Sequence, residues 1–335
     1  MNESALISGG RAPVPASLTR SPSKIRTFSL DPYYRDAVDD VVHAFGSIES
    51  AVPVLHELSP LVLRPDIIAT RGGGRLLARL DEMGYVPVAG RPLEFTRHLV
   101  REIWRYQLNI ATRQRIDVMD MVMLGAIGLY VLLRRRPPGT DVPATVMVSR
   151  LKGPSAPERR RPEHLRALAG PGQESVLTYI HVSDEPADIV RELGVFFDRR
   201  ERLRLLAAAR AGANDPTDVF AQLAQLEDDT TSATFDVSEA LDELVRLVEA
   251  RGRSAVGDET LALAQAVRTG RSRDWPALLG LVDRLGVPWP RWHRVAVAAH
   301  ASDRHLDARP AVEDLDDGAW LPTGEPVEAD RGVRS

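Results

Sequence analysis

The sequence contains no cysteine among its 335 residues. This absence excludes a disulfide scaffold, a zinc–cysteine site, an iron–sulfur cluster and a thiol nucleophile. Aromatic residues make up only 5% of the chain, but 44% of it is apolar, so Leu, Val and Ala can still build a sizeable core. The formal net charge of −4 is nearly balanced and gives no argument for nucleic acid as the partner.

Lysine and long apolar runs are scarce as well. Lys24 and Lys152 are the only lysines, and arginine carries the rest of the positive charge, as a GC-rich coding sequence would produce. The most apolar stretch, residues 118–133, is interrupted by Asp120 and by glycines and is shorter than the ~18 residues of a membrane span. The N-terminus lacks the apolar core of a signal peptide. We therefore expect a soluble cytoplasmic protein without a membrane partner.

The pattern along the chain predicts four regions. Residues 1–57 form an N-terminal arm and helix, with the first ~27 residues disordered and the helix beginning after Asp31. Residues 58–198 alternate strands and helices, which is typical of one α/β domain. Residues 199–306 carry only helical patterns, and residues 307–335 form a flexible acidic tail in which Trp320 has no evident role.

Within the α/β region we expect strands and helices at specific places. The strands are predicted near residues 61–63, 85–89, 127–133 and 176–182. The helices are predicted near residues 72–83, 95–108 and 185–197.

One histidine stands at a position suited to chemistry. His181 closes an apolar run, and helical residues follow it at once, with Glu192 eleven positions further on. A side chain at the start of a helix can lie beside backbone donors that hold phosphate oxygens. The alternative is a histidine that belongs to the core or merely ends a strand.

The order of motifs from Leu61 to Phe197 resembles that of the nucleoside diphosphate kinase family. The family begins with a strand and Lys-Pro-Asp, where this chain has Arg64-Pro65-Asp66. Its Pro-x-x-x-Arg step corresponds to Pro162–Arg166, and its Asn-x-x-His-Gly-Ser-Asp motif to residues 178–184. The shared order extends over about 135 residues, although each match alone is weak.

The resemblance implies a fold and a reaction. The fold would be a ferredoxin-like antiparallel sheet covered by helices, here with an all-α C-terminal extension. The reaction would be ping-pong transfer of the γ-phosphoryl group of a nucleoside triphosphate through a phosphohistidine at His181. Glu192 would orient the ring, Arg166 would stabilise the transferring oxygens, and Ser183 would bond to Glu192 or to the phosphoryl group.

The resemblance also assigns nucleotide-binding positions. These would be Arg64, Tyr106, Arg150, Ser155 and Thr178, with Tyr106 chosen by its 19-residue distance to Gly125. Mg²⁺ would be bound through the phosphates of ATP or another nucleoside triphosphate, with no protein metal site. Relatives assemble as homo-oligomers, but the added regions leave the oligomeric state open. The family also implies a helix at Thr145–Val148, where β-branching alone would favour a strand, and residues 141–143 offer a helix N-terminal signal.

Three departures from the family pattern bear on activity. Arg64 replaces a lysine, Thr178 replaces an asparagine, and Val182 replaces a glycine beside the nucleophile. Valine adds bulk at the histidine and cannot easily adopt the positive φ that a glycine allows. One hypothesis is therefore an active phosphotransferase whose acceptor is a nucleoside diphosphate or a small molecule of specialised metabolism. The other is a catalytically inactive nucleotide-binding regulatory or scaffold protein.

Overall fold

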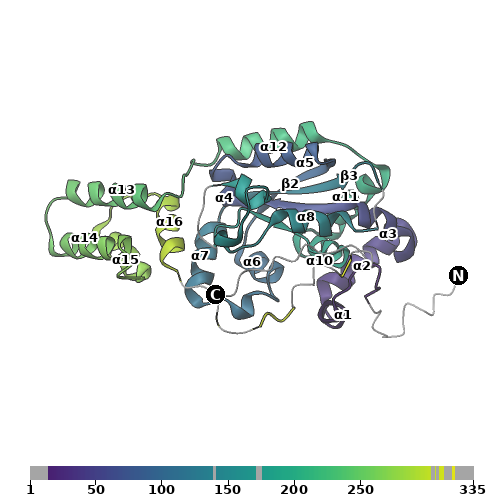
Figure 1. Cartoon of the computed structure of the whole chain (residues 1–335), viewed down its shortest axis with the longest axis horizontal. Coiled ribbons are helices and arrows are strands. Elements are labelled where there is room, and N and C mark those ends of the chain that lie inside the picture. Colours follow the sequence, from purple (N-terminus) through teal and green to yellow (C-terminus); the bar gives the residue numbers. More distant parts are fainter. Residues whose placement is uncertain are drawn as a thin grey trace.

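A computed structural model describes residues 14–138, 141–170, 176–302, 306, 309–312 and 319–320. The strands are β1 (Leu58–Leu63), β2 (Tyr85–Glu94), β3 (Ile127–Arg135) and β4 (Ile180–Val182). They form one antiparallel sheet in the order β2-β3-β1-β4. This is the ferredoxin-like sheet that the resemblance implied, and the predicted fold class is confirmed (Figure 1).

Strand β1 pairs with a strand on each side, and its residues are apolar or small, as a buried position requires. Its six residues are all buried between β3 and β4. Val62 lies opposite Tyr130 of β3 on one side and opposite His181 of β4 on the other. The register of the most buried strand therefore fixes the backbone of His181.

Helices surround the sheet. Before and between the strands they are α1 (Pro22–Phe28), α2 (Pro32–Phe45), α3 (Ile48–Glu57), α4 (Pro65–Ala69), α5 (Gly73–Glu82), α6 (Arg97–Ile103), α7 (Arg113–Met123), α8 (Ala144–Lys152) and α9 (Leu165–Ala169), with short 3₁₀ turns η2 (Leu108–Ile110) and η3 (Pro157–Arg159). After β4 they are α10 (Pro186–Phe196), α11 (Arg199–Ala211), α12 (Pro216–Asp228), α13 (Val237–Ala250), α14 (Ala255–Arg268), α15 (Trp275–Leu285) and α16 (Arg291–Ala301). Within these described ranges no helix is long and apolar enough to cross a membrane.

The start of the chain is folded where disorder was predicted. Residues 1–13 lie outside the described part, but Leu18 and Phe28 are buried in the core and Ala187 donates its backbone N–H to the Leu18 carbonyl. Helix α2 begins as predicted, because the Asp31 carboxylate accepts from the first backbone N–H groups. The prediction of disorder was wrong for residues 14–27, whose few apolar side chains all find partners.

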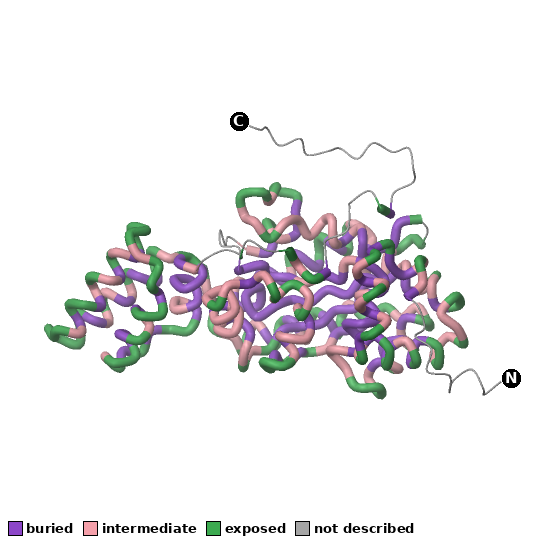
Figure 2. The backbone as a smooth tube through the Cα atoms, turned by 90° about the horizontal axis from the view of Figure 1, so that it is seen from below, coloured by how far each residue is buried: buried purple, intermediate pink, exposed green. Residues whose placement is uncertain are grey.

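The helical extension divides into two parts (Figures 1 and 2). Helix α12 packs on β2 closely enough that a Cβ at Gly90 would meet Val219 at 3.0 Å, so α12 belongs to the body of the α/β domain. Helices α13–α16 form a lobe that projects from this body, and the buried side chains of the lobe are continuous with the core of the body. The lobe is joined back through Arg291, whose guanidinium donates to carbonyls at the end of α7.

Two predicted elements are shorter in the structure. The helix expected over 95–108 ends at Ile103, and turns follow it. The strand expected over 176–182 has only three residues, because Tyr179 adopts φ 61°. Helix α7 was not predicted, whereas the helix expected at Thr145–Val148 is present as α8.

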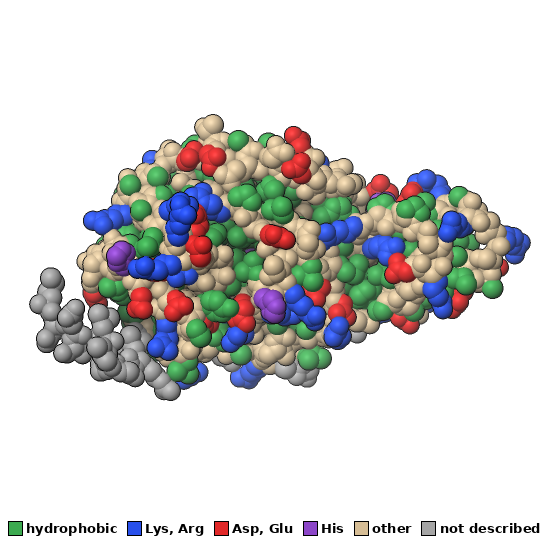
Figure 3. Space-filling view, turned by 180° about the vertical axis from the view of Figure 1, so that it is seen from behind, with side chains coloured by type: hydrophobic (Ala, Val, Ile, Leu, Met, Phe, Trp, Pro, Cys, Tyr) green, Lys and Arg blue, Asp and Glu red, His purple; other side chains and the backbone are tan. Residues whose placement is uncertain are grey.

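On the face in Figure 3 acidic and basic side chains are interspersed.

Candidate active site

A cavity of about 480 Å³ opens beside the end of β4. One of its walls is a face of α8, since Val146, Ser149, Arg150 and Gly153 follow the i, i+3, i+4, i+7 pattern. Six of the residues predicted for the site line the cavity: Arg64, Arg150, Ser155, Arg166, Thr178 and His181. The predicted residues Glu192 and Ser183 lie behind His181, and Tyr106 is not among the lining residues.

His181 is held by a buried carboxylate. Its Nε2 lies 2.8 Å from Oε1 of Glu192, whose other oxygen accepts from the Ser183 hydroxyl at 2.6 Å. Glu192 is 6% exposed, whereas the side chain of His181 is 17% exposed and faces the cavity. Because an ionised carboxylate only accepts, Nε2 carries the ring proton and Nδ1 keeps its lone pair. Nδ1 is thus the ring nitrogen that the contact with Glu192 leaves free to act as an acceptor.

The aromatic side chain beside this histidine is Trp104, not the predicted Tyr106. The ring of Trp104 meets the imidazole edge-on at 5.7 Å, and the Arg64 guanidinium lies 5.8 Å from its centroid. Tyr106 instead donates its hydroxyl to Asp31 at 2.9 Å and packs against Arg191. The spacing argument failed because residues 104–107 form a turn beyond α6, so side chains two positions apart point to different sides.

Two of the departures from the family pattern contact each other. The Arg64 guanidinium donates to the Thr178 hydroxyl, to the Val176 carbonyl at 3.3 Å and to Asp66 at 3.2 Å. A forked arginine can reach these partners together, which an ammonium on a shorter stem cannot do in the same way. Arg64 and Thr178 therefore act as a matched pair.

The third departure, Val182, occupies a position where the backbone does not adopt positive φ. It pairs with Leu61 inside the antiparallel ladder and is fully buried. The positive φ in this segment belongs to Tyr179, whose backbone N–H donates to Asp66 at 2.9 Å. The backbone strain expected from a valine beside the nucleophile is absent at this residue.

Positive charge dominates the cavity wall. Arg64, Arg115, Arg150, Lys152 and Arg166 line it, and Asp184 is the one carboxylate among the described lining residues. Burial, together with nearby Arg160 and Arg64, lowers the pKa of Arg166; burial and Arg64 likewise lower the pKa of Arg115. Such crowding of like charges is relieved by an anion, so the cavity is suited to a polyphosphate.

Several lining residues were missed from the sequence. Arg115 lies on the unpredicted helix α7, and Trp104 was read only as a large side chain of the expected helix. Pro310 and Trp320 come from the C-terminal region, where the sequence offered no site argument for Trp320. Trp320 is 6% exposed and donates its indole N–H to Glu185 at 2.8 Å. Nothing short of the fold connects position 320 with the cavity.

Part of this chain is similar to known proteins. Residues 57–202 match the family model described as nucleoside diphosphate kinase. A nucleoside diphosphate kinase of Methanothermobacter thermautotrophicus (strain Delta H) is 27% identical over 152 residues, covering 43% of this chain and 89% of the relative. The Aquifex aeolicus nucleoside diphosphate kinase structure has 22% identity and a TM-score of 0.35, covering 42% and 95% of the two chains. The structure of an NDP kinase from Pyrobaculum aerophilum has 21% identity and a TM-score of 0.35, covering 44% of this chain and 98% of that chain.

The sheet, the carboxylate-held histidine and the family match together define the class of this domain. It is a domain of the nucleotide phosphotransferase class. More narrowly, residues 57–202 are similar to the nucleoside diphosphate kinase family, as the motif order predicted. The remaining regions of the chain lie outside that match.

Proposed function

We propose that the protein is a nucleoside triphosphate-dependent phosphotransferase that transfers the γ-phosphoryl group through a phosphohistidine at His181. The observation that carries this proposal is the contact between Nε2 of His181 and Glu192, in a cavity lined by five cationic side chains. The contact leaves Nδ1 unprotonated, and His181 is one of the residues that line the cavity.

The two half-reactions follow from this arrangement. The lone pair of Nδ1 attacks the γ-phosphorus, the bond to the bridging oxygen breaks, and the nucleoside diphosphate leaves. Nε2 keeps its proton, and Glu192 balances the positive charge of the phosphorylated ring. An acceptor oxygen then attacks the phosphorus and the electron pair returns to Nδ1. Arg64 and Arg166 line the cavity and would stabilise the transferring oxygens.

The other predicted positions take supporting roles in this proposal. Arg150, Ser155 and Thr178 line the cavity and would contact the nucleotide, while Ser183 fixes Glu192. Trp104 would border the phosphoryl group where Tyr106 was expected. The acceptor is a nucleoside diphosphate or a small molecule of specialised metabolism, and the cytoplasmic location remains a proposal.

Mg²⁺ fits this site as an ion carried by the nucleotide. In the part of the chain that the structure describes, no group of three or more His, Asp or Glu side chains is placed to hold a metal ion. A cavity rich in cations and holding a single carboxylate suits phosphate oxygens rather than a bare cation. Bound to the phosphates, Mg²⁺ would neutralise part of their charge.

Incubation with γ-labelled ATP and Mg²⁺ tests the proposal. The wild type should acquire label that is acid-labile and alkali-stable, as a phosphohistidine is, and His181→Ala should not. Chase with a nucleoside diphosphate or candidate small molecules should discharge the label and identify the acceptor class. Absence of label in wild type that still binds ATP would refute the proposal and favour a nucleotide-binding regulatory or scaffold protein.

A further inference from the structure

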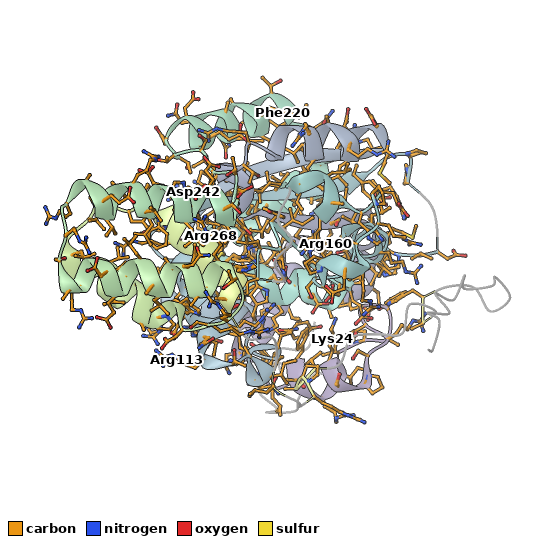
Figure 4. The ribbon with its side chains drawn as sticks, turned by 60° about the vertical axis from the view of Figure 1, so that its left-hand side comes forward. Lys24, Arg113, Arg160, Phe220, Asp242 and Arg268 are labelled. Carbon is orange, nitrogen blue, oxygen red and sulfur yellow. The ribbon has the colours of Figure 1, made fainter. Side chains whose placement is uncertain are left out.

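The two lysines of the chain converge on one short segment. All other positive side chains are arginine, yet Lys24 and Lys152 both bind acids in residues 184–188, immediately after β4. Lys24 reaches Asp188 at 2.5 Å and Glu185 at 3.1 Å, from α1 on the lower side of the body in Figure 4. Lysine is thus found where an ammonium contacts the segment that follows the nucleophile.

Lys152 differs from Lys24 because it lines the cavity. Its Nζ lies 3.1 Å from Oδ1 of Asp184 and 3.4 Å from the carbonyl of Val182, the residue after His181. The side chain is 13% exposed, at the end of α8. An ammonium has three N–H groups and two are directed to these acceptors, so one remains to meet a ligand in the cavity.

Asp184 is fixed and ionised, which makes it an anchor for this ammonium. The Ser149 hydroxyl donates to the same Oδ1 at 2.6 Å. Burial disfavours the charged form of Asp184, but Lys152, Lys24 and the Ser149 hydrogen bond outweigh it and hold its pKa below the ordinary value. A carboxylate held in this way positions Lys152 without taking up its proton.

The arginines beside His181 have less freedom to follow a moving group. Arg166 donates to the Gly153 carbonyl at 2.5 Å and to the Thr178 carbonyl at 3.3 Å. Arg64 donates to Asp66, Val176 and Thr178. A compact ammonium on a flexible stem can shift between two acceptors, whereas a planar guanidinium bound along its edges holds one geometry.

From these contacts we infer that Lys152 is a catalytic residue that moves from Asp184 to the phosphoryl oxygens during transfer to and from His181. The inference rests on the proposed function. The ammonium stays protonated throughout, so it adds positive charge at the phosphoryl group and takes part in no bond making or breaking. It supplies the moving cation that the fixed guanidinium groups do not.

The test compares Lys152→Met, Lys152→Arg and the matched control Lys24→Met. Each folded variant, verified by circular dichroism, is mixed rapidly with γ-labelled ATP and Mg²⁺, and the rate of His181 labelling is measured. Lys152→Met should label about 100-fold more slowly than wild type, as on removal of one preorganised donor. Lys152→Arg should remain at least about tenfold slow, because the fork cannot follow the group. Lys24→Met should label at the wild-type rate.

Binding supplies a second measurement that does not need turnover. A non-hydrolysable triphosphate analogue should bind Lys152→Met about tenfold more weakly than wild type, while the diphosphate binds within about threefold, because the contact is made to the γ-phosphoryl group. Equal labelling of Lys152→Met and wild type would overturn this inference alone. An equal loss in Lys24→Met would assign the effect to folding of segment 184–188 and would overturn it too. Absence of label in the wild type would overturn the proposed function as well.

Discussion

Glu192→Gln is the substitution that most directly tests the geometry of the histidine. The side chain keeps its size, but its amide N–H group can donate to Nε2, which Glu192 cannot do. The Ser183 hydroxyl favours the arrangement in which the amide oxygen faces it and the amide nitrogen faces His181, given the 2.6 Å and 2.8 Å contacts of the wild type. Nε2 then becomes an acceptor, and the ring proton moves to Nδ1, where it blocks attack.

The expected loss follows from the hydrogen bond itself. A hydrogen bond to a charged group contributes about 1.5–3 kcal/mol. At about 1.4 kcal/mol per tenfold change, its removal slows phosphorylation by about 10- to 150-fold, and the wrong tautomer adds to this. Burial of Glu192, at 6% exposed, means that water cannot replace the contact. We expect a loss of about 100-fold.

Two measurements check this prediction. Rapid-quench labelling gives the rate of phosphohistidine formation, and ¹⁵N NMR of the imidazole reports which nitrogen carries the proton. Ser183→Ala is the control: it removes a contact of Glu192 but leaves the ring tautomer, so its rate should fall less than about tenfold. Wild-type labelling rates in Glu192→Gln, or a proton on Nδ1 in the wild type, would refute the reasoning.

Three further predictions concern the cavity wall. In a double-mutant cycle, Arg64→Lys and Thr178→Asn should couple by about 1 kcal/mol or more in unfolding free energy, because the two side chains are hydrogen-bonded. Pyrophosphate at 100 times its dissociation constant for the wild type should stabilise the wild type by about 2.7 kcal/mol, which is seen as a rise in Tm. At the same pyrophosphate concentration the rise in Tm should be smaller in Arg166→Met. Trp104→Leu should weaken nucleotide binding about tenfold, whereas Tyr106→Phe should lower stability by about 1 kcal/mol and leave nucleotide affinity unchanged.

Each of these has an outcome that contradicts it. Strict additivity of the two substitutions would show that the Arg64–Thr178 contact contributes nothing. A pyrophosphate response in Arg166→Met equal to that of the wild type would remove this arginine from the anion site. Loss of nucleotide affinity in Tyr106→Phe, with Trp104→Leu unaffected, would restore the assignment made from spacing alone.

The sequence predicted the sheet and the proximity of His181 to Glu192 because both depend on local order. Apolar runs of the right length mark β1 and β3, and His181 and Glu192 lie eleven residues apart across one strand–helix step. Such short separations leave little room for insertions to break the correspondence. The same holds for α8, where the turn before Ala144 decides for a helix against β-branching.

Prediction failed where distant segments decide the outcome. Tyr106 was predicted from its 19-residue distance to Gly125, but the turn after Ile103 leaves Trp104 on the cavity wall and Tyr106 bonded to Asp31. Segment 14–28 has too few apolar residues to fold alone, yet Leu18 and Phe28 are buried against elements more than a hundred residues away in sequence. Tertiary contacts of this range leave no periodic signal in the chain.

Glu185 shows that the family boundary is not a folding boundary. This carboxylate is fully buried and accepts hydrogen bonds from the Thr19 hydroxyl, the backbone N–H of Arg20 and the Trp320 indole, with Lys24 at 3.1 Å. All four partners lie outside residues 57–202. A chain trimmed to the matched residues would lose these four contacts together with the segments that bury Glu185, so the carboxylate would meet water. Segments on both sides of the matched residues thus contribute to the packing at the start of α10.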